Sequence, residues 1–302
     1  MVTATRQIKP FLKWAGGKGQ LIDQISSFLP VSFKTGKIKK YFEPFLGGGA
    51  IYFWLADHYD FEYAYLYELN PSVAICYQVI QTNVKKLVKE LDALEKEYIN
   101  GSDCAREELF YDNREEFNGF LRRRSANSHL RRAALLIFLN KTCFNGLYRV
   151  NSKGEFNVPF GRYKNPTLCN EDNLLAVHDL LQNAEIICGD FEQCLEHTDN
   201  NSFVYFDPPY RPISTTASFT SYSKDNFDDN EQKRLRSVFG DLDSRGANVM
   251  LSNSDPKNND PDDNFFDDLY QGYHIERLNA TRLINCNAER RGSITEILVM
   301  NY

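Results

Sequence analysis

The feature that most constrains the fold is a repeated alternation of short apolar strands with helices. Residues 41–45 (YFEPF) and 63–69 (YAYLYEL) are predicted strands on either side of the helical stretch IYFWLADHY, and two more strands are predicted at 185–188 and 203–206. The helix EQKRLRSVFGDLDSRG, which Gly246 is expected to stop, then precedes the buried strand ANVMLSN. Strands that alternate with helices predict a parallel, doubly wound sheet. The expected fold class is therefore α/β.

One long stretch, residues 74–168, interrupts this alternation. It opens in a helical pattern, continues as a basic helical pattern at 105–142, and ends in a segment at 147–163 that alternates around a Ser-Lys-Gly turn and predicts a β-hairpin. We therefore expect an inserted, mainly helical domain at 74–168 and an α/β domain formed by 1–73 and 169–302. The latter should end in the short helix FFDDLYQGY and two strands, the last being ITEILVMNY.

The charge of the chain is unevenly distributed. Residues 122–164 contain ten Lys and Arg against one acid, Glu155, so this segment carries +9 and leaves −15 for the rest of a chain whose net charge is −6. Such asymmetry indicates an electropositive surface suited to a polyanion, although solvated helix faces would give the same pattern.

Other classes of protein are disfavoured by what the sequence lacks. No apolar run approaches the roughly 18 residues needed to span a bilayer, and the N-terminus has no secretory h-region, so we expect a cytoplasmic protein without a membrane partner. The seven cysteines are scattered without a C-x-x-C pair, so we expect free thiols and no metal site.

Two glycine-containing segments indicate a cofactor site. In FEPFLGGGA, Gly47, Gly48 and Gly49 follow a strand, and Glu68 ends the next strand about 20 residues on, where doubly wound folds place a carboxylate for ribose hydroxyls. This spacing indicates an adenosine-containing cofactor but does not distinguish a dinucleotide from S-adenosylmethionine. In FLKWAGGKGQL, Trp14 lies between lysines and glycines, which suits a loop over a planar ligand or an ordinary core position.

The strand VYF ends in DPPY, residues 207–210. Each proline removes a backbone donor, so the pair ends the strand. The Asp207 carboxylate and the Pro208 carbonyl suit the two hydrogens of a nucleobase amino group, whose lone pair is then aimed at an electrophile, and Tyr210 offers a face for stacking. Such a base must leave its duplex to be reached.

Five motifs in this order, FLKWAGGK, FEPFLGGGA, FNGLYRVNSKGEFNVPFGRY, GDF and FDPPY, resemble those of the Dam family of DNA adenine methylases. The resemblance is close over residues 11–210 and extends to GSITEILVMNY near the C-terminus. It implies a Rossmann-like methyltransferase sheet with an inserted DNA-recognition domain. The implied reaction transfers a methyl group from S-adenosylmethionine to N6 of adenine in double-stranded DNA by an enzyme that we expect to be monomeric.

The resemblance also implies roles for particular residues. The implied catalytic residues are Asp207, Pro208, Pro209 and Tyr210. The implied cofactor residues are Trp14, Lys18, Phe45, Gly47, Gly48, Gly49, Glu68, Asp190 and Asp207. The family often has aspartate where this chain has Glu68; the longer side chain still reaches a ribose, so the difference bears on affinity and not on chemistry.

DNA contacts are implied in the same way. The residues matched to base contacts are Lys13, Leu147, Arg149, Pro159 and Tyr163, with Asn145 and Tyr148 as nearby candidates, of which Tyr148 either inserts or packs. Arginine can pair with guanine O6 and N7. The expected phosphate contacts are Arg122, Arg123, Arg124, Arg131, Arg132 and Lys164. Relatives with this hairpin methylate GATC, and a similar branch methylates GATATC; GATC is our expectation.

The motifs also bear on four alternative classes of protein. A cytosine-C5 methylase is excluded because its nucleophilic thiol generally follows a proline and no Pro-Cys occurs. An N4-cytosine methylase usually carries serine in place of Asp207. A dinucleotide dehydrogenase would leave DPPY without a role. A non-catalytic DNA-binding relative is disfavoured by the intact DPPY motif.

Overall fold

The structure is a computed structural model that describes residues 8–14, 16–123, 128–211, 227–281 and 293–302. The strands are β1 (Lys40–Glu43), β2 (Tyr63–Tyr67), β3 (Ala184–Ile187), β4 (Ser202–Phe206), β5 (Asn248–Ser254), β6 (His274–Thr281) and β7 (Ser293–Met300). The helices are α1 (Ile22–Ser27), α2 (Val31–Lys34), α3 (Ala50–His58), α4 (Pro71–Asn100), α5 (Asp103–Arg123), α6 (His129–Thr142), α7 (Glu171–Leu180), α8 (Asp229–Ser244) and α9 (Phe265–Leu269).

The strands form a seven-stranded sheet in the order β3-β2-β1-β4-β5-β7-β6. The pairs β1–β2, β1–β4 and β4–β5 are parallel, which confirms the predicted α/β class. β7 pairs antiparallel with both β5 and β6, so the sheet is mixed at this edge, a feature that the sequence did not predict. An antiparallel pair does not need the long crossover connection that a parallel pair requires.

The order of the strands places the end of β4 at a particular point of the sheet. From β1 the chain moves outward to β2, and from β4 it moves the other way to β5, so the direction of winding reverses between β1 and β4. Ligands of doubly wound sheets bind outside the carboxyl ends of the strands at such a switch point. Every residue of β4 is buried, as expected for a central parallel strand, and Asp207 follows its last residue.

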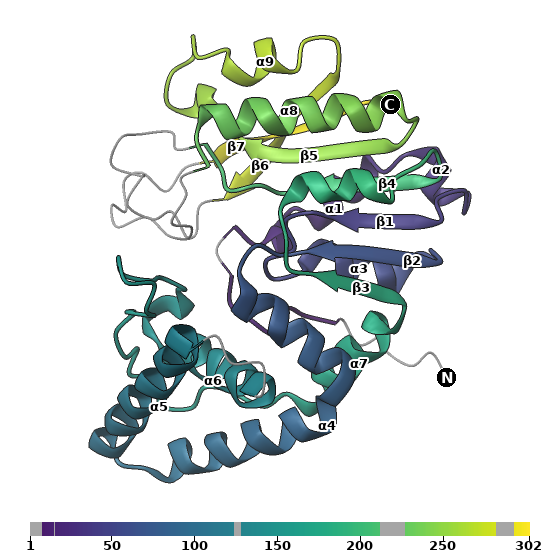
Figure 1. Ribbon diagram of the computed structural model, residues 1–302. Coiled ribbons are helices and arrows are strands. Elements are labelled where there is room, and N and C mark those ends of the chain that lie inside the picture. The colour runs from purple at the N-terminus through teal and green to yellow at the C-terminus, as the bar shows by residue number, and fades with distance from the viewer. Residues whose placement is uncertain (1–7, 15, 124–127, 212–226, 282–292) are drawn as a thin grey trace. The chain divides into compact units, whose positions relative to one another are not determined.

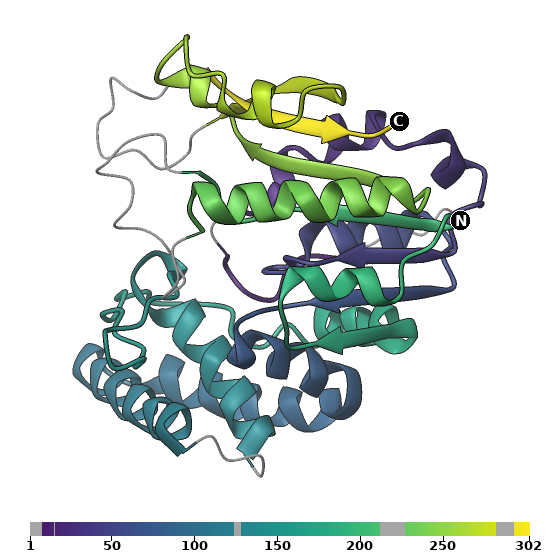
Figure 2. The same cartoon turned by 45° about the horizontal axis from the view of Figure 1, so that its top comes forward.

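The chain divides into two compact units. The first comprises Met1–Gly17, Gly47–Asp57 and Glu68–Cys188, and the second comprises Lys18–Leu46, His58–Tyr67 and Gly189–Tyr302. In the second unit α8 runs along β5 (Figures 1 and 2). The Asp228 side chain caps the start of α8 by accepting from the backbone N–H groups of Asn230 and Glu231. Gly246, with φ of +78°, follows the helix end as predicted.

In the first unit α4, α5 and α6 pack against one another (Figures 1 and 2). Asn70 caps α4 through the Ser72 N–H, with Pro71 as the first helical residue. The predicted hairpin turns back on itself, since Val150 pairs with Phe156 and Asn151 N–H donates to the Glu155 carbonyl at 2.9 Å. Its arms contain isolated bridges in the place of the predicted regular strands.

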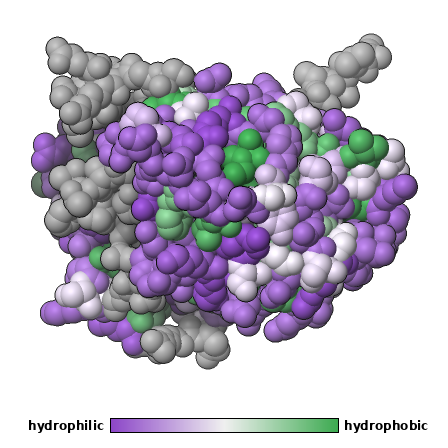
Figure 3. All heavy atoms as spheres, turned by 90° about the horizontal axis from the view of Figure 1, so that it is seen from above, coloured by the Kyte–Doolittle hydropathy of each residue, from purple (hydrophilic) through white to green (hydrophobic). Residues whose placement is uncertain are grey.

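The exposed apolar side chains are dispersed. On the face drawn in Figure 3, hydrophilic residues predominate and hydrophobic ones form only small, separate areas. Among the helices that the structure describes, none has the length and apolar character required to cross a membrane. Within the same described ranges, no group of three or more His, Cys, Asp or Glu side chains is arranged to hold a metal ion.

Candidate active site and DNA interface

The DPPY segment lies directly after β4 and carries a buried ion pair. Lys18 Nζ lies 2.7 Å from Asp207 Oδ1, with the two side chains 3% and 21% exposed. The same ammonium lies 4.5 Å from the centroid of the Tyr210 ring. A carboxylate, a cation and an aromatic face thus meet at the switch point of the sheet, and sequence positions 18 and 207–210 are brought together.

The electrostatics of Asp207 reflect two opposing effects. Burial raises the pKa of the Asp207 carboxyl above its usual value, and the neighbouring Lys18 ammonium works against that rise. The Glu296 carboxylate adds to the increase in the Asp207 pKa, because two negative charges repel. Lys18 is therefore the group that favours the ionised, hydrogen-bond-accepting form of Asp207.

A buried polar cluster holds the backbone after the two prolines. Gln232 Nε2 donates to the Pro209 carbonyl at 3.4 Å, and Asn253 Nδ2 donates to Gln232 Oε1 at 3.1 Å. Asn253 Oδ1 accepts from the Arg211 N–H at 3.3 Å. Gln232 and Asn253 are fully buried, where polar groups persist only when they are paired. These side chains from α8 and β5 therefore hold the loop in place.

Asp190, which was predicted to line the cofactor pocket, forms a two-point ion pair. Arg234 from α8 contacts both carboxylate oxygens of Asp190 at 2.8 Å, and this arginine lowers the Asp190 pKa. The Arg234 guanidinium carbon also lies 4.0 Å above the Phe191 ring, and Phe191 stacks on Phe45 with centroids 5.2 Å apart. Arg234 is a residue that sequence reasoning missed; no motif marks it.

The glycine loop of the first unit can accept only glycine at two of its positions. Gly47 and Gly49 have φ of +47° and +69°. A Cβ on Gly47 would lie 2.7 Å from Trp14 Cδ1, and one on Gly49 would lie 2.7 Å from Tyr77 Oη. The Tyr77 hydroxyl donates to the Gly47 carbonyl at 3.0 Å. The loop and the Trp14 indole are therefore in close contact.

Glu68 is fixed by the glycine loop and by the cap of α4. Its Oε2 accepts from the Gly47 N–H at 3.0 Å and its Oε1 from the Asn70 N–H at 2.8 Å. Burial raises the pKa of the Glu68 carboxyl to about 7, against the opposing effect of those two backbone donors. Each oxygen retains a further lone pair, so the ionised carboxylate can accept from ligand hydroxyls.

A buried asparagine joins the FLKW segment to the loop that follows α6. Asn140 Oδ1 accepts from the Lys13 N–H at 2.7 Å, and Asn140 Nδ2 donates to the carbonyls of Lys13 and Gly146 at 2.8 and 2.9 Å. Gly146 has φ of +64°, and a Cβ there would lie 2.4 Å from Lys13 Cδ. The predicted base-contacting residues Lys13 and Leu147 are thereby brought close together.

The other predicted base contacts lie on this loop and on the segment after it. Arg149 is exposed, and its Nε donates to Asn157 Oδ1 at 2.8 Å. Lys13 Nζ lies 4.5 Å from the Tyr163 ring centroid. Asn145 has φ of +56°, a left-handed conformation that non-glycine residues rarely adopt. Pro159 is exposed, and its carbonyl accepts from the Phe144 N–H at 2.9 Å.

Tyr148 is one candidate that the structure removes. Its side chain is 6% exposed, with its ring 5.9 Å from that of Trp14 and 5.7 Å from that of Phe156. Of the two possibilities left open by the sequence, packing is the one observed. The neighbouring Phe144, which we did not predict, is 51% exposed and presents an aromatic ring that can stack with a base.

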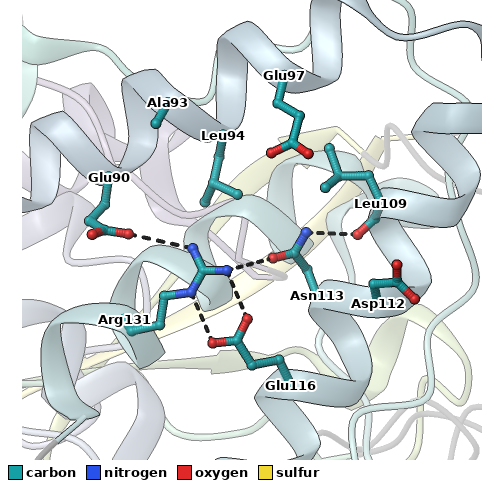
Figure 4. A pocket seen from close by; sticks show the side chains of 9 residues that line it. All are labelled: Glu90, Ala93, Leu94, Glu97, Leu109, Asp112, Asn113, Glu116 and Arg131. Atoms are coloured by element: carbon teal, nitrogen blue, oxygen red, sulfur yellow. Dashed lines mark hydrogen bonds and ion pairs between the residues drawn. The ribbon is translucent and has the colours of Figure 1, made fainter.

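Several predicted phosphate contacts are already engaged by the protein. Arg132 is 8% exposed and donates to the Ser72 hydroxyl, so its predicted phosphate contact was wrong. Arg131 pairs with Glu116 at 2.7 Å and Glu90 at 3.4 Å, and it also donates to the Asn113 side chain (Figure 4). These groups line a hollow of about 320 Å³ between α4, α5 and α6. Arg131 therefore neutralises acids, and the phosphate prediction does not fit it.

The other basic residues predicted to contact phosphates differ in whether acidic side chains already pair with them. Arg122 pairs with Glu115 and with Glu155, the latter at 2.8 Å. Lys164 is exposed. Arg123 is the last residue of α5, and Arg124 lies outside the described residues. The positive charge available to DNA is thus smaller than the number of Lys and Arg residues between positions 122 and 164 suggests. Acidic residues earlier in the chain pair with some of these arginines and neutralise them.

Comparisons with known proteins agree with this chemistry. The family described as "D12 class N6 adenine-specific DNA methyltransferase" matches residues 14–284. Type II methyltransferase M.MjaIII of Methanocaldococcus jannaschii is 48% identical over 98% of this chain and 100% of its own length. Type II methyltransferase M1.LlaDCHI of Lactococcus lactis subsp. cremoris is 38% identical over 98% of this chain and 96% of its own. The DNA adenine methylase of Escherichia coli (strain K12) is 33% identical, with 97% and 95% covered.

The sheet, the DPPY segment and these matches together define a DNA methyltransferase. The chain belongs to the D12 class of N6 adenine-specific DNA methyltransferases, the class of the Dam family that its motifs resemble. The predicted family and enzyme class are therefore confirmed: it is an adenine-specific DNA methyltransferase.

Proposed function

We propose that this enzyme transfers the methyl group of S-adenosylmethionine to N6 of an adenine that has rotated out of double-stranded DNA, within the sequence GATC. The observation that carries the proposal is the arrangement of Asp207, Lys18 and Tyr210 at the carboxyl end of β4. It offers an acceptor for an amino hydrogen beside a face for a planar base. A base inside a stacked duplex cannot reach such a site.

The protein's part in this reaction is to orient the amino group. The lone pair of adenine N6 is delocalised into the ring, so free N6 is a weak nucleophile. Hydrogen bonds from N6 to the Asp207 carboxylate and the Pro208 carbonyl would direct that lone pair toward the methyl carbon. When bound, S-adenosylmethionine would supply the electrophilic methyl group and would keep the electron pair of the sulfur–methyl bond on sulfur, and N6 would release a proton to water after the new bond has formed.

The residues proposed to hold the methyl donor are those that the motifs assign to it. The buried Glu68 carboxylate beside Gly47, Gly48 and Gly49 fits the ribose hydroxyls, and Trp14 lies against the glycine loop. Phe45, Asp190 and Lys18 are proposed as further contacts of the donor. A glycine loop followed by a strand-end carboxylate is the arrangement that binds adenosine cofactors in doubly wound sheets, which supports this assignment.

Residues 74–168 are proposed as the target-recognition domain, with residues 1–73 and 169–302 as the catalytic domain. Arg149 is exposed and its Nε donates to Asn157 Oδ1, and we propose that its guanidinium contacts guanine, a base with which arginine can form two hydrogen bonds. The proposed base contacts are Lys13, Asn145, Leu147, Arg149, Pro159 and Tyr163. Arg123, Arg124 and Lys164 are proposed to contact phosphates, and Arg122 would do so by exchanging its carboxylate partners. We further propose that the enzyme acts as a monomer.

The proposal is tested by mapping methylation on a plasmid that carries no methyladenine. Purified protein and S-adenosylmethionine are incubated with the plasmid, and N6-methyladenine is located by sequencing, with donor-free protein as the control. We expect methyladenine in GATC sites and nowhere else. Methylation confined to GATATC would contradict the proposed site, and methyl groups on cytosine N4 would contradict the proposed chemistry.

A further inference from the structure

Glu296 lies next to the catalytic loop and has no role in the scheme above. It is part of β7, far from the DPPY motif in sequence, and the Tyr210 hydroxyl donates a hydrogen bond to Glu296 Oε2. Burial, together with the nearby Asp207 and Glu296 carboxylates, raises the pKa of the Tyr210 hydroxyl well above its usual value. The phenol therefore keeps its proton and remains a donor to Glu296 at neutral pH.

The backbone of Glu296 is tied to the same loop. In the antiparallel register of β5 and β7, Glu296 lies opposite Ser254. The Ser254 hydroxyl donates to the carbonyl of Arg211, the residue after Tyr210, at 2.9 Å. Ser254 therefore connects the strand position of Glu296 to the end of the catalytic loop. This connection holds the Glu296 carboxylate in place beside the Tyr210 hydroxyl.

The Tyr210 ring also faces the cationic part of the site. Lys18 Nζ lies 4.5 Å from the ring centroid and 2.7 Å from Asp207. A hydrogen bond from a phenol to a carboxylate increases the electron density of the ring, which strengthens its attraction for a positive charge above its face. Positive charge develops on adenine as N6 accepts the methyl group, and a ring held in this way would stabilise it.

We propose that Glu296 is a positioning residue for methyl transfer: by accepting the Tyr210 hydroxyl, it fixes the ring on which the extruded adenine stacks. This inference rests on the proposed function. It assigns strand β7 a part in the reaction, through a single side chain that acts by holding the Tyr210 hydroxyl. Its effect should therefore appear in the rate of the chemical step and pass through the Tyr210 hydroxyl.

A double-mutant cycle tests this dependence. Single-turnover methylation of a duplex is measured for the wild type, Glu296→Ala, Tyr210→Phe and the double variant, with Glu276→Gln on the neighbouring strand β6 as an exposed control. We expect Glu296→Ala to lower the single-turnover rate about tenfold or more with unchanged donor affinity, and the double variant to be no slower than the slower single variant. Rate losses that multiply would overturn the inference.

A second variant and an optical probe keep the test independent of folding. Glu296→Gln retains an acceptor oxygen, so it should recover most of the rate lost in Glu296→Ala, and it should have no further effect in the Tyr210→Phe background. With 2-aminopurine at the target position, Glu296→Ala should change the fluorescence of the extruded base, whereas Glu276→Gln should not. An unchanged single-turnover rate in Glu296→Ala would refute the role of Glu296 but not the proposed function. A wild type that methylates no adenine would refute the proposed function itself.

Discussion

Replacing Lys18 by methionine removes the cation from the buried ion pair while keeping an unbranched side chain only one atom shorter. At the observed 2.7 Å and an effective dielectric constant of about 20, the attraction between Lys18 and Asp207 is about 6 kcal/mol. Desolvation of the two groups cancels much of that attraction, and loss of one partner of a buried pair costs about 3–5 kcal/mol. Asp207 keeps 21% exposure, so we expect Lys18→Met to lower the free energy of unfolding by about 3 kcal/mol.

The loss of stability in Lys18→Met should also depend on pH, in a direction that the Asp207 pKa determines. Burial already raises the Asp207 pKa, and without Lys18 it rises further. The stability deficit of Lys18→Met relative to the wild type should be largest where Asp207 is ionised. It should shrink as the pH is lowered from about 8 to about 5, because a proton then neutralises the buried charge. Urea unfolding followed by circular dichroism at both pH values measures the deficit.

The matched control is Lys39→Met in the same unit. Lys39 pairs with Glu62 at 3.1 Å, but the side chains are 49% and 72% exposed, so this substitution should change stability by no more than about 0.5 kcal/mol. If Lys18→Met costs no more than Lys39→Met, or if its deficit does not vary with pH, our account of the Asp207 environment is refuted.

Three further results are expected. Gly49→Ala should lower the free energy of unfolding by about 2–3 kcal/mol, and Gly36→Ala by only about 1 kcal/mol, because both have positive φ but only Gly49 would bring a Cβ to 2.7 Å from Tyr77 Oη. Donor affinity, measured by calorimetry, should increase as the pH rises through about 7, because Glu68 must lose its proton to accept ribose hydroxyls. Arg149→Ala should relax the choice of base at one position by about 1–3 kcal/mol, measured by competition between duplexes.

Each of these results has an outcome that contradicts it. Equal losses for the two glycine variants would show that the contact with Tyr77 is unimportant. In Glu68→Gln the donor affinity should not vary between about pH 6 and about pH 8, and a persistent slope would assign the titration to another group. If Arg149→Ala weakens binding to all duplexes equally, as expected for Lys153→Ala at the exposed turn, then Arg149 contacts a phosphate.

Local patterns were sufficient for most of the fold. Strands β1, β2, β4 and β5 were predicted because a buried parallel strand is an apolar run bounded by turn residues, and α8 because its apolar period and Gly246 are local signals. The convergence of Lys18 with Asp207 was predicted from the motifs that the chain shares with its family. The sequence therefore predicted the sheet and the position of its catalytic loop.

What the sequence did not predict depends on partners distant along the chain. The phosphate assignments of Arg131 and Arg132 failed because nothing near them in sequence shows that they meet Glu90, Glu116 and Ser72. The antiparallel pairing of β7 was missed because strand direction is set by connections and not by composition. Tertiary packing determines which distant residues pair with one another, and the local sequence does not contain this information.

The most direct test of the central claim is the product formed on a duplex with one GATC site by the wild type and by Asp207→Ala. Nucleosides from a single turnover are separated and identified by mass spectrometry, and duplex binding is measured in parallel. We predict N6-methyladenine as the wild-type product and a loss of about 100-fold or more in rate for Asp207→Ala with duplex binding retained. Full activity without the Asp207 carboxylate, or a methyl group on any other atom, would contradict the account.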